Sequence, residues 1–127
     1  MNIIIITALP KLLESPLSHS IMQRAQDKGL LNVKLINLRK YGIGKHQQID
    51  DYQFGGGAGM VMSCEPLERC IEELMAAHQF DEIIYLTPDG LPYKQQTANT
   101  LSLQKKLLLI CGHYKGIDER IREKYVT

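Results

Sequence analysis

Several features that mark special classes of protein are missing from these 127 residues. The apolar run near the amino end, "IIII", is four residues long, which is far too short for a signal peptide or a membrane span. The chain also contains no internal repeat and no low-complexity tract. These absences predict one ordinary globular domain without a membrane partner.

A strong excess of positive charge is missing too, because the formal net charge is only +1. Any RNA-binding surface must therefore be local. The three cysteines, Cys64, Cys70 and Cys111, form no C-x-x-C pair and cannot all pair within one chain, which favours a reduced, cytosolic setting. No histidine or cysteine pair has the spacing of metal ligands, so no metal site is predicted.

What the sequence does contain is an alternation of strand and helix patterns. Continuous apolar runs predict buried strands at 2–7, 82–87 and 106–111, and a partly alternating run predicts another at 30–38. Helical patterns cover 15–29, 65–78, 95–103 and 116–126. In the first of these helices, Ser15 is the expected cap and Pro16 the expected first helical residue. The sequence therefore predicts an α/β domain whose mostly parallel sheet has flanking helices.

Two segments follow predicted strands, where ligands bind in sheets of this kind. "YLTPDG" (Tyr85–Gly90) contains the turn sequence Pro88-Asp89-Gly90. It can be a plain turn, a ligand wall with exposed backbone groups, or both. "CGHYKGIDER" (Cys111–Arg120) ends with Asp118 and Glu119, which are expected at the start of a helix, where carboxylates suit the helix dipole.

The stretch "DDYQFGGGAGMVM" (Asp50–Met62) is unusually rich in glycine. It lacks the G-K-[ST] ending of a phosphate-binding loop and does not lead from a strand directly into a helix. Its apolar residues, such as Phe54 and Met60, would be out of place in a pure linker, which is polar. We therefore expect a close-packed backbone turn against a large, flat ligand.

Taken together, "DDYQFGGGAGMVM", "YLTPDG" and "LLLICGHYKGIDERI" resemble, in order and separation, the bacterial tRNA (guanine-N1-)-methyltransferases, the TrmD type of the SPOUT superfamily. "ITALP" and "SIMQRAQDKGL" agree with this family, so the resemblance covers essentially the whole chain. It implies transfer of a methyl group from S-adenosylmethionine to N1 of the guanosine 3′ to the anticodon in tRNA. It also implies a cytoplasmic homodimer of α/β domains with a trefoil knot. The residues themselves leave another class open, a non-catalytic nucleotide-binding or dimerising domain that uses the same loops.

The resemblance also assigns roles to individual residues. The cofactor-binding residues that it implies are Tyr85, Leu86, Thr87, Pro88, Asp89, Gly112, His113, Tyr114, Lys115 and Gly116. The substrate-binding residues that it implies are Asp50, Phe54, Gly55, Gly56, Gly57 and Gly59. Cofactor contacts would come largely from backbone groups, and the glycines would let the backbone approach the adenosyl group closely.

The sequence departs from the family pattern at two positions and at its end. Ala58 stands where the family often has proline, and a proline would stiffen the glycine-rich loop. Lys115 stands where many members have glutamate, which argues against a magnesium ion at that position. The family continues beyond Thr127 with a third cofactor loop and a tRNA-binding domain that carries the presumed general base. We therefore expect residues 1–127 to be an amino-terminal domain with an incomplete knot, inactive alone, and with no catalytic base of its own.

Overall fold

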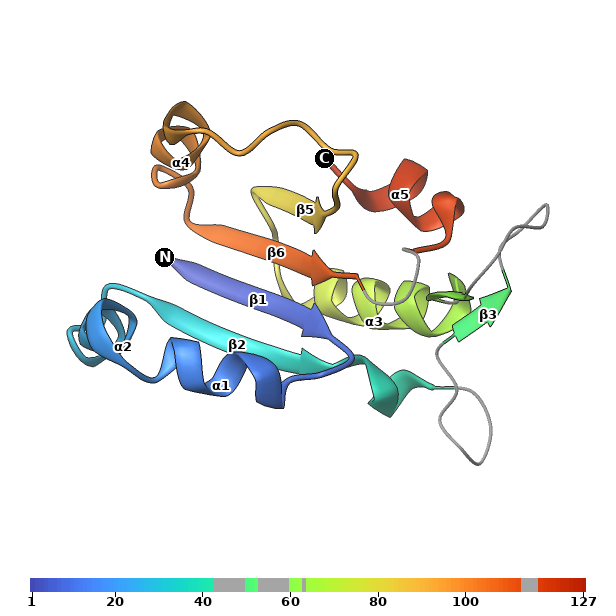
Figure 1. The fold of residues 1–127 in the computed structure, drawn as a ribbon, viewed down its shortest axis with the longest axis horizontal. Coiled ribbons are helices and arrows are strands. Elements are labelled where there is room, and N and C mark those ends of the chain that lie inside the picture. The colour runs from blue at the N-terminus through green and yellow to red at the C-terminus, as the bar shows by residue number, and fades with distance from the viewer. Residues whose placement is uncertain (43–49, 53–59, 63, 113–116) are drawn as a thin grey trace.

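The computed structural model describes residues 1–42, 50–52, 60–62, 64–112 and 117–127. Its main strands are β1 (Asn2–Thr7), β2 (Asn32–Asn37), β5 (Glu82–Leu86) and β6 (Lys106–Cys111). They form one sheet in the order β2-β1-β6-β5, and every neighbouring pair is parallel (Figure 1). All four predicted strands are confirmed to within two residues at each end.

The helices connect these strands and lie on both faces of the sheet (Figure 1). They are α1 (Lys11–Leu17), α2 (Ser20–Asp27), the 3-10 helix η1 (Leu38–Tyr41), α3 (Cys64–Ala77), α4 (Gln95–Leu101) and α5 (Glu119–Tyr125). The predicted α/β class with a parallel sheet is therefore confirmed. No helix in the described ranges combines the length and the apolar character that crossing a membrane requires.

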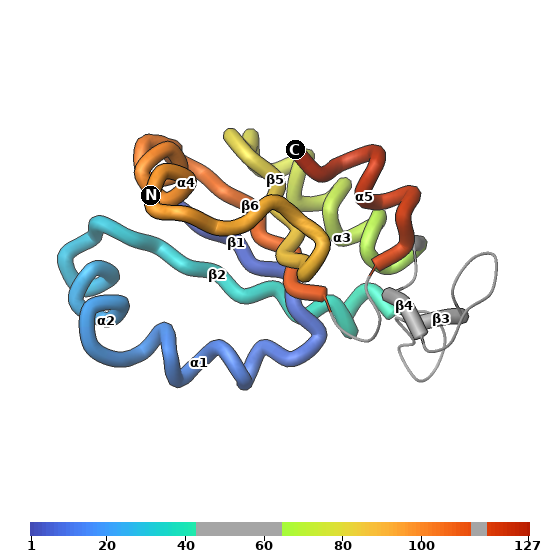
Figure 2. Tube along the Cα trace, turned by 45° about the horizontal axis from the view of Figure 1, so that its top comes forward, coloured from blue at the N-terminus to red at the C-terminus, as the bar shows by residue number. Residues whose placement is uncertain are grey.

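The hydrophobic core lies between one face of the sheet and the helices α3 and α5. Alternate residues of each strand point to this face, so Ile6 and Ile110 are fully buried against Leu67, Ile71 and their neighbours. Figure 2 shows α3 and α5 together on one side of the sheet, with α1 and α2 on the other. The β-branched runs of the sequence thus supply the layer on which both core helices pack.

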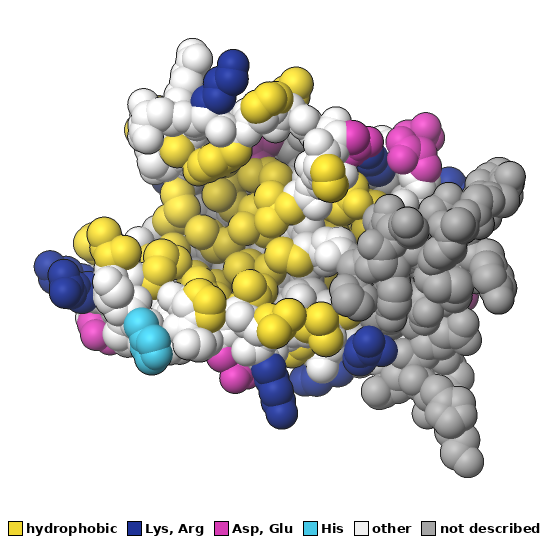
Figure 3. All heavy atoms as spheres, viewed as in Figure 1, with side chains coloured by type: hydrophobic (Ala, Val, Ile, Leu, Met, Phe, Trp, Pro, Cys, Tyr) yellow, Lys and Arg dark blue, Asp and Glu magenta, His cyan; other side chains and the backbone are white. Residues whose placement is uncertain are grey.

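The second face of the sheet is less well covered. None of α1, α2 and α4 contains a buried residue, and Leu12 and Ile21 are 69% and 71% exposed. Figure 3 shows apolar side chains gathered in the hollow over the sheet between α4 and the α1–α2 pair. Most of the burial that stabilises the described fold therefore comes from the α3–α5 face.

The helix predicted at 15–29 is wrong as a single element. The chain forms α1 and α2 instead, and Pro16 lies inside α1, whose cap is Pro10. A proline at this depth lacks the N–H that the helix ladder needs, and α1 ends one residue later. The backbone then turns through Ser20, whose φ is 56°, before α2 continues.

A second small sheet was not anticipated from the sequence. The strands β3 (Asp50–Tyr52) and β4 (Met60–Met62) pair in antiparallel fashion around the glycine-rich segment. Each strand is only three residues long, which leaves too little alternation for a strand pattern to be recognised.

We predict that Leu108→Ala lowers the free energy of unfolding by about 2–5 kcal/mol, because the truncation leaves a cavity in the packed core. Leu108 is fully buried, whereas Leu103 is 83% exposed. The matched variant Leu103→Ala should therefore change stability by less than about 0.5 kcal/mol. Denaturant unfolding measures both, and equal losses in the two variants would contradict the placement of the core.

Candidate functional site

An open cavity of about 340 Å³ lies at the carboxyl end of β5. Two segments line it, the end of β5 with the turn that follows and the first part of α5. The lining residues are Tyr85, Thr87, Pro88, Asp89, Ile117, Glu119 and Arg122. The cavity is therefore at the edge of the sheet where a ligand was expected.

The turn after β5 is held by its own hydrogen bonds. The Gly90 N–H donates to the Thr87 carbonyl oxygen at 3.3 Å, and the Thr87 hydroxyl donates to the Asp89 carboxylate. The predicted turn at Pro88-Asp89-Gly90 is thus confirmed. Because its polar groups bond within the turn, the segment has a defined shape without any ligand.

An ion pair joins this turn to α5. Nη1 of Arg122 lies 3.0 and 3.2 Å from the two carboxylate oxygens of Asp89, and the guanidinium lies 5.6 Å from the centroid of the Tyr85 ring. The Thr87 hydroxyl, first, and Arg122, second, hold the pKa of Asp89 below its ordinary value. The Asp89 carboxylate is therefore ionised at neutral pH. Its bond to Arg122 holds the turn after β5, which forms one wall of the cavity, against α5, which forms the other.

The start of α5 is set by a cap that the sequence predicted. The Asp118 carboxylate accepts from the backbone N–H of Arg120 at 2.9 Å and from its guanidinium at 2.7 and 2.9 Å. Hydrogen bonding to the Arg120 side chain is the main reason why the pKa of Asp118 is lowered. The capping role expected for this residue is confirmed.

The far end of α5 is anchored to two other elements. The Tyr125 hydroxyl donates to the carboxylates of Glu68, at 3.2 Å, and Glu72 on α3. The Thr127 N–H donates to the Ile83 carbonyl oxygen of β5 at 2.9 Å. With both ends held, α5 presents the cavity-lining residues in a fixed position.

Gly112, just beyond the end of β6, lies against the aromatic ring of Tyr85. A Cβ at this position would be 3.1 Å from Cε1 and 3.3 Å from the hydroxyl oxygen of that ring. The ring thus leaves little room for a side chain at residue 112, and the predicted contact of Gly112 with a cofactor stays a prediction. Residue 112 therefore influences the cavity through the position of Tyr85.

Two observations on the described side chains bear on the chemistry of the site. Burial raises the pKa of the Cys70 thiol to about 12 and raises that of Cys111 as well, so neither thiol is an ionised nucleophile at neutral pH. Within the described ranges, no three His, Cys, Asp or Glu side chains are grouped as metal ligands. The cavity lining described above is one that can bind and orient a ligand.

Four of the predicted cofactor residues come together in this cavity: Tyr85, Thr87, Pro88 and Asp89. Leu86 alternates to the other face and is 52% exposed. Asp50 is the first residue of β3 and pairs with Met62. The other predicted site residues lie outside the described ranges, namely His113, Tyr114, Lys115, Gly116, Phe54, Gly55, Gly56, Gly57 and Gly59.

The sequence analysis did not anticipate Ile117 and Arg122 in the cavity, and it considered Glu119 only as part of a helix start. A signal was available, because residues three apart on a helix lie on the same face. Glu119 and Arg122 have this spacing directly after a strand-end loop. Nothing in the sequence, however, indicates that this face of α5 points toward β5.

Comparison with known proteins gives a consistent result. The model of the family described as tRNA (Guanine-1)-methyltransferase TrmD matches residues 1–127. The tRNA (guanine-N(1)-)-methyltransferases of Christiangramia forsetii and Cytophaga hutchinsonii are 53% and 54% identical over the 127 residues. The match covers all of this chain and 56% and 54% of those proteins, so the chain spans about half their length.

A solved structure agrees with this comparison. The crystal structure of tRNA (m1G37) methyltransferase from Aquifex aeolicus superposes with a TM-score of 0.88 at 27% sequence identity. The similarity covers 98% of this chain and 56% of that chain. The sheet and the helices that form the cavity are thus part of a fold shared with that protein.

We predict that Arg122→Gln raises the pKa of Asp89 toward the ordinary aspartate value of about 3.9, because a hydrogen-bonded cation is removed. Because folding lowers the pKa of Asp89, the stability that the bridge contributes is fully present above the ordinary aspartate pKa. It is lost as the pH falls through the folded-state pKa. NMR titration of the Asp89 carboxyl group measures the shift. The control is Glu123→Gln, which changes an exposed residue next to Arg122 on α5. If Arg122→Gln left the pKa of Asp89 unchanged, or shifted it no more than the control does, the bridge would be contradicted.

Proposed function

The chain belongs to the TrmD family of tRNA (guanine-1)-methyltransferases, and from this premise we propose that the protein methylates N1 of the guanosine 3′ to the anticodon in tRNA. The methyl donor that we propose is S-adenosylmethionine. The observation that carries the proposal is the identity of 53% across all 127 residues to a curated relative named for this activity. The relatives are nearly twice as long, so the activity is proposed for the whole protein and not for these residues alone.

The cavity at the end of β5 suits such a methyl donor. Its volume of about 340 Å³ falls within the range of roughly 300–1,000 Å³ that small-molecule sites occupy. Tyr85 and Ile117 offer apolar surface for a flat base, and the backbone at the strand end offers hydrogen-bonding groups. The Glu119 carboxylate on the same cavity wall is complementary to a ligand that carries positive charge.

The donor supplies a methyl group on a sulfonium, which needs correct placement more than covalent assistance. In this proposal, the Asp89–Arg122 bridge keeps the turn and α5 at a fixed separation, and Tyr85 supports the ring face of the ligand. Such preorganisation can contribute about 7–11 kcal/mol when it holds the two reactants in line. The thiols of Cys70 and Cys111 have no part in it.

Guanine N1 carries a proton at neutral pH, so a base must remove it. The described cavity carboxylates are Asp89, which is bound to Arg122, and Glu119. We propose that the base, the third cofactor loop and the domain that holds tRNA belong to the half of the protein that the relatives have beyond this chain. The trefoil knot is part of the same proposal.

The protein is also proposed to be a cytoplasmic homodimer that binds tRNA. Support for an interface comes from the incompletely covered second face of the sheet, since large exposed apolar patches usually mark contacts.

The test of the proposed activity is a methyl-transfer assay on the intact protein. Unmodified tRNA and S-adenosylmethionine with a labelled methyl group should yield 1-methylguanosine after nuclease digestion. The control transcript carries adenosine in place of the guanosine 3′ to the anticodon, and its kcat/KM should be at least about 100-fold lower. Equal labelling of both transcripts, or label on another atom, would overturn the proposal.

The proposed cofactor cavity can be tested at Gly112. Gly112→Ala places a Cβ within about 3.1 Å of the Tyr85 ring, so the ring, which lines the cavity, must shift by a few tenths of an ångström. We expect the affinity for S-adenosylmethionine to fall by roughly tenfold, about 1.4 kcal/mol. Calorimetry on the intact protein measures this loss.

The matched control is the pair of variants Tyr85→Leu and Tyr85→Leu/Gly112→Ala. Without the aromatic ring, the alanine has little left to displace, so the second substitution should add little further loss. Contacting residues show such non-additivity, whereas independent sites do not. Full additivity would show that Gly112 acts on the cofactor by another route.

A further inference from the structure

A local excess of positive charge follows the first helical segment. Residues 28–49 contain five lysines and arginines and no aspartate or glutamate, although the whole chain has a net charge of only +1. The five are Lys28, Lys34, Arg39, Lys40 and Lys45. The described part of this stretch includes β2, an edge strand of the main sheet, and η1. Lys34, Arg39 and Lys40 therefore lie on β2 and η1, along one edge of the main sheet.

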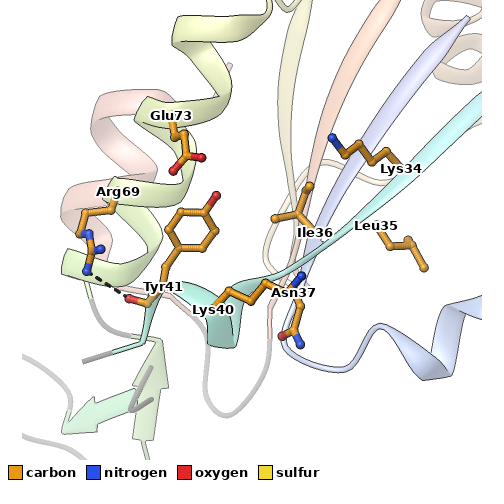
Figure 4. A pocket seen from close by; sticks show the side chains of 8 residues that line it. All are labelled: Lys34, Leu35, Ile36, Asn37, Lys40, Tyr41, Arg69 and Glu73. Atoms are coloured by element: carbon orange, nitrogen blue, oxygen red, sulfur yellow. Dashed lines mark hydrogen bonds between the residues drawn. The ribbon is translucent and has the colours of Figure 1, made fainter. Parts of the chain in front are cut away.

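Two of these cations line a cavity of about 520 Å³ between β2 and α3, which is larger than the one at β5. Lys34 comes from β2, Lys40 from η1 and a third cation, Arg69, from α3. In Figure 4, the Lys34 side chain extends from β2 toward the side of α3, and the Lys40 side chain runs from η1 along the end of β2 toward Asn37. Three separate elements thus bring positive charge to one cleft.

These charges are only weakly balanced by the residues around them. The ion pairs within the described ranges involve Arg120, Arg122 and Lys124, and neither Lys34 nor Lys40 takes part in one. Nη1 of Arg69 donates to a carbonyl oxygen, that of Tyr41, at 3.5 Å. The cleft is therefore left with a positive potential that an anionic ligand can satisfy.

The carboxylate in the cleft, Glu73, is turned toward a different partner. Its side chain points toward the Tyr41 hydroxyl (Figure 4). Burial first, then the charges of Cys70 and Glu73, raise the pKa of Tyr41. Glu73 thus holds the tyrosine that forms the back of the cleft, and it offsets one of the three cations.

The cleft and the proposed cofactor cavity lie at opposite edges of the same sheet. β1 and β6 separate β2 from β5, which puts the two edges about 15 Å apart at the usual strand spacing. The cavity at β5 lies at the carboxyl end of its strand, and the cleft at β2 extends from Lys34 to η1, which follows the carboxyl end of β2 directly. A folded polynucleotide can bridge this distance, with a base at one edge and its backbone at the other.

We propose that the cleft between β2 and α3 binds backbone phosphates of the RNA substrate through Lys34, Lys40 and Arg69. The proposal rests on the proposed function, because it assigns a second contact to the same tRNA. Contacts of this kind fix the register of the RNA and do not read its sequence. Lysine ammonium groups act here as point charges, and the arginine guanidinium adds a donor at the rim.

The test is the salt dependence of tRNA binding by the intact protein. Binding weakens as salt rises, so the slope of log K against log salt is negative, and each lost phosphate contact reduces its magnitude by roughly 0.7–0.9. The double variant Lys34→Gln/Lys40→Gln should therefore reduce the magnitude of the slope by roughly 1.4–1.8. Its KM for tRNA should rise, with KM for S-adenosylmethionine and kcat unchanged. Lys34→Arg/Lys40→Arg keeps the charge and should restore the slope.

The matched control is Lys94→Gln/Lys105→Gln, which removes two exposed lysines near the opposite end of the sheet. This variant should keep the slope of the unmodified protein. An unchanged slope in Lys34→Gln/Lys40→Gln, or an equal fall in the control, would overturn the inference. A change in self-association without a change in RNA binding would also overturn it and assign the cleft to a protein contact.

These outcomes are separable from failure of the proposed function. The salt slope is measured by binding alone, so it tests the cleft even if no methyl transfer is found. Conversely, methylation by a protein whose slope does not depend on Lys34 and Lys40 would refute the cleft and leave the activity in place.

Discussion

The parallel pairing of β1 with both β2 and β6 is the constraint on which the rest of the structure depends. Because the three strands run in one direction, their carboxyl ends meet at one side of the sheet. The alternation of Ile4 and Ile6 toward one face gives α3 and α5 a common surface to pack on. The cavity at β5 and the cleft at β2 are both consequences of this alignment.

Helix α5 shows how a short element can be fixed by a few contacts spread along its length. It is seven residues long, and an isolated helix of that length is unstable in water. The Asp118 cap closes its first turn, the Arg122–Asp89 bridge joins it to the turn after β5, and the Tyr125 hydroxyl joins it to α3. Ile121 buries against the core between these contacts. Polar contacts of this kind add specificity of position, whereas the apolar residue supplies most of the stabilisation.

Much of the fold follows from the sequence, because its strands are continuous β-branched or apolar runs and α3 has a clear apolar stripe. The break between α1 and α2 was missed because the pattern around Leu17, Ile21 and Ala25 continues across it, while Pro16 and the positive φ of Ser20 interrupt the backbone. Local backbone constraints of this kind override the periodicity of the side chains.

The candidate site was predictable only in part, for a related reason. Strand-end position and turn chemistry indicated Tyr85 to Asp89, and all of these residues except Leu86 line a cavity. Arg122 could not be placed, because its role depends on how α5 lies across β5. The close contact between Gly112 and the Tyr85 ring likewise joins two strands and leaves no local pattern in the sequence.

The central position of β1 also constrains how the chain can be made. Ile3 pairs with Leu107, about 100 residues later in the sequence, and such distant contacts slow folding. At about 5–20 residues per second, a ribosome needs roughly 5–20 s to synthesise the intervening segment. During that time, β1 can pair with β2 but keeps a free edge and an unburied row of isoleucines. The nascent chain is therefore exposed to chaperones and to aggregation until β6 emerges, and β6 must then join a strand that was made first.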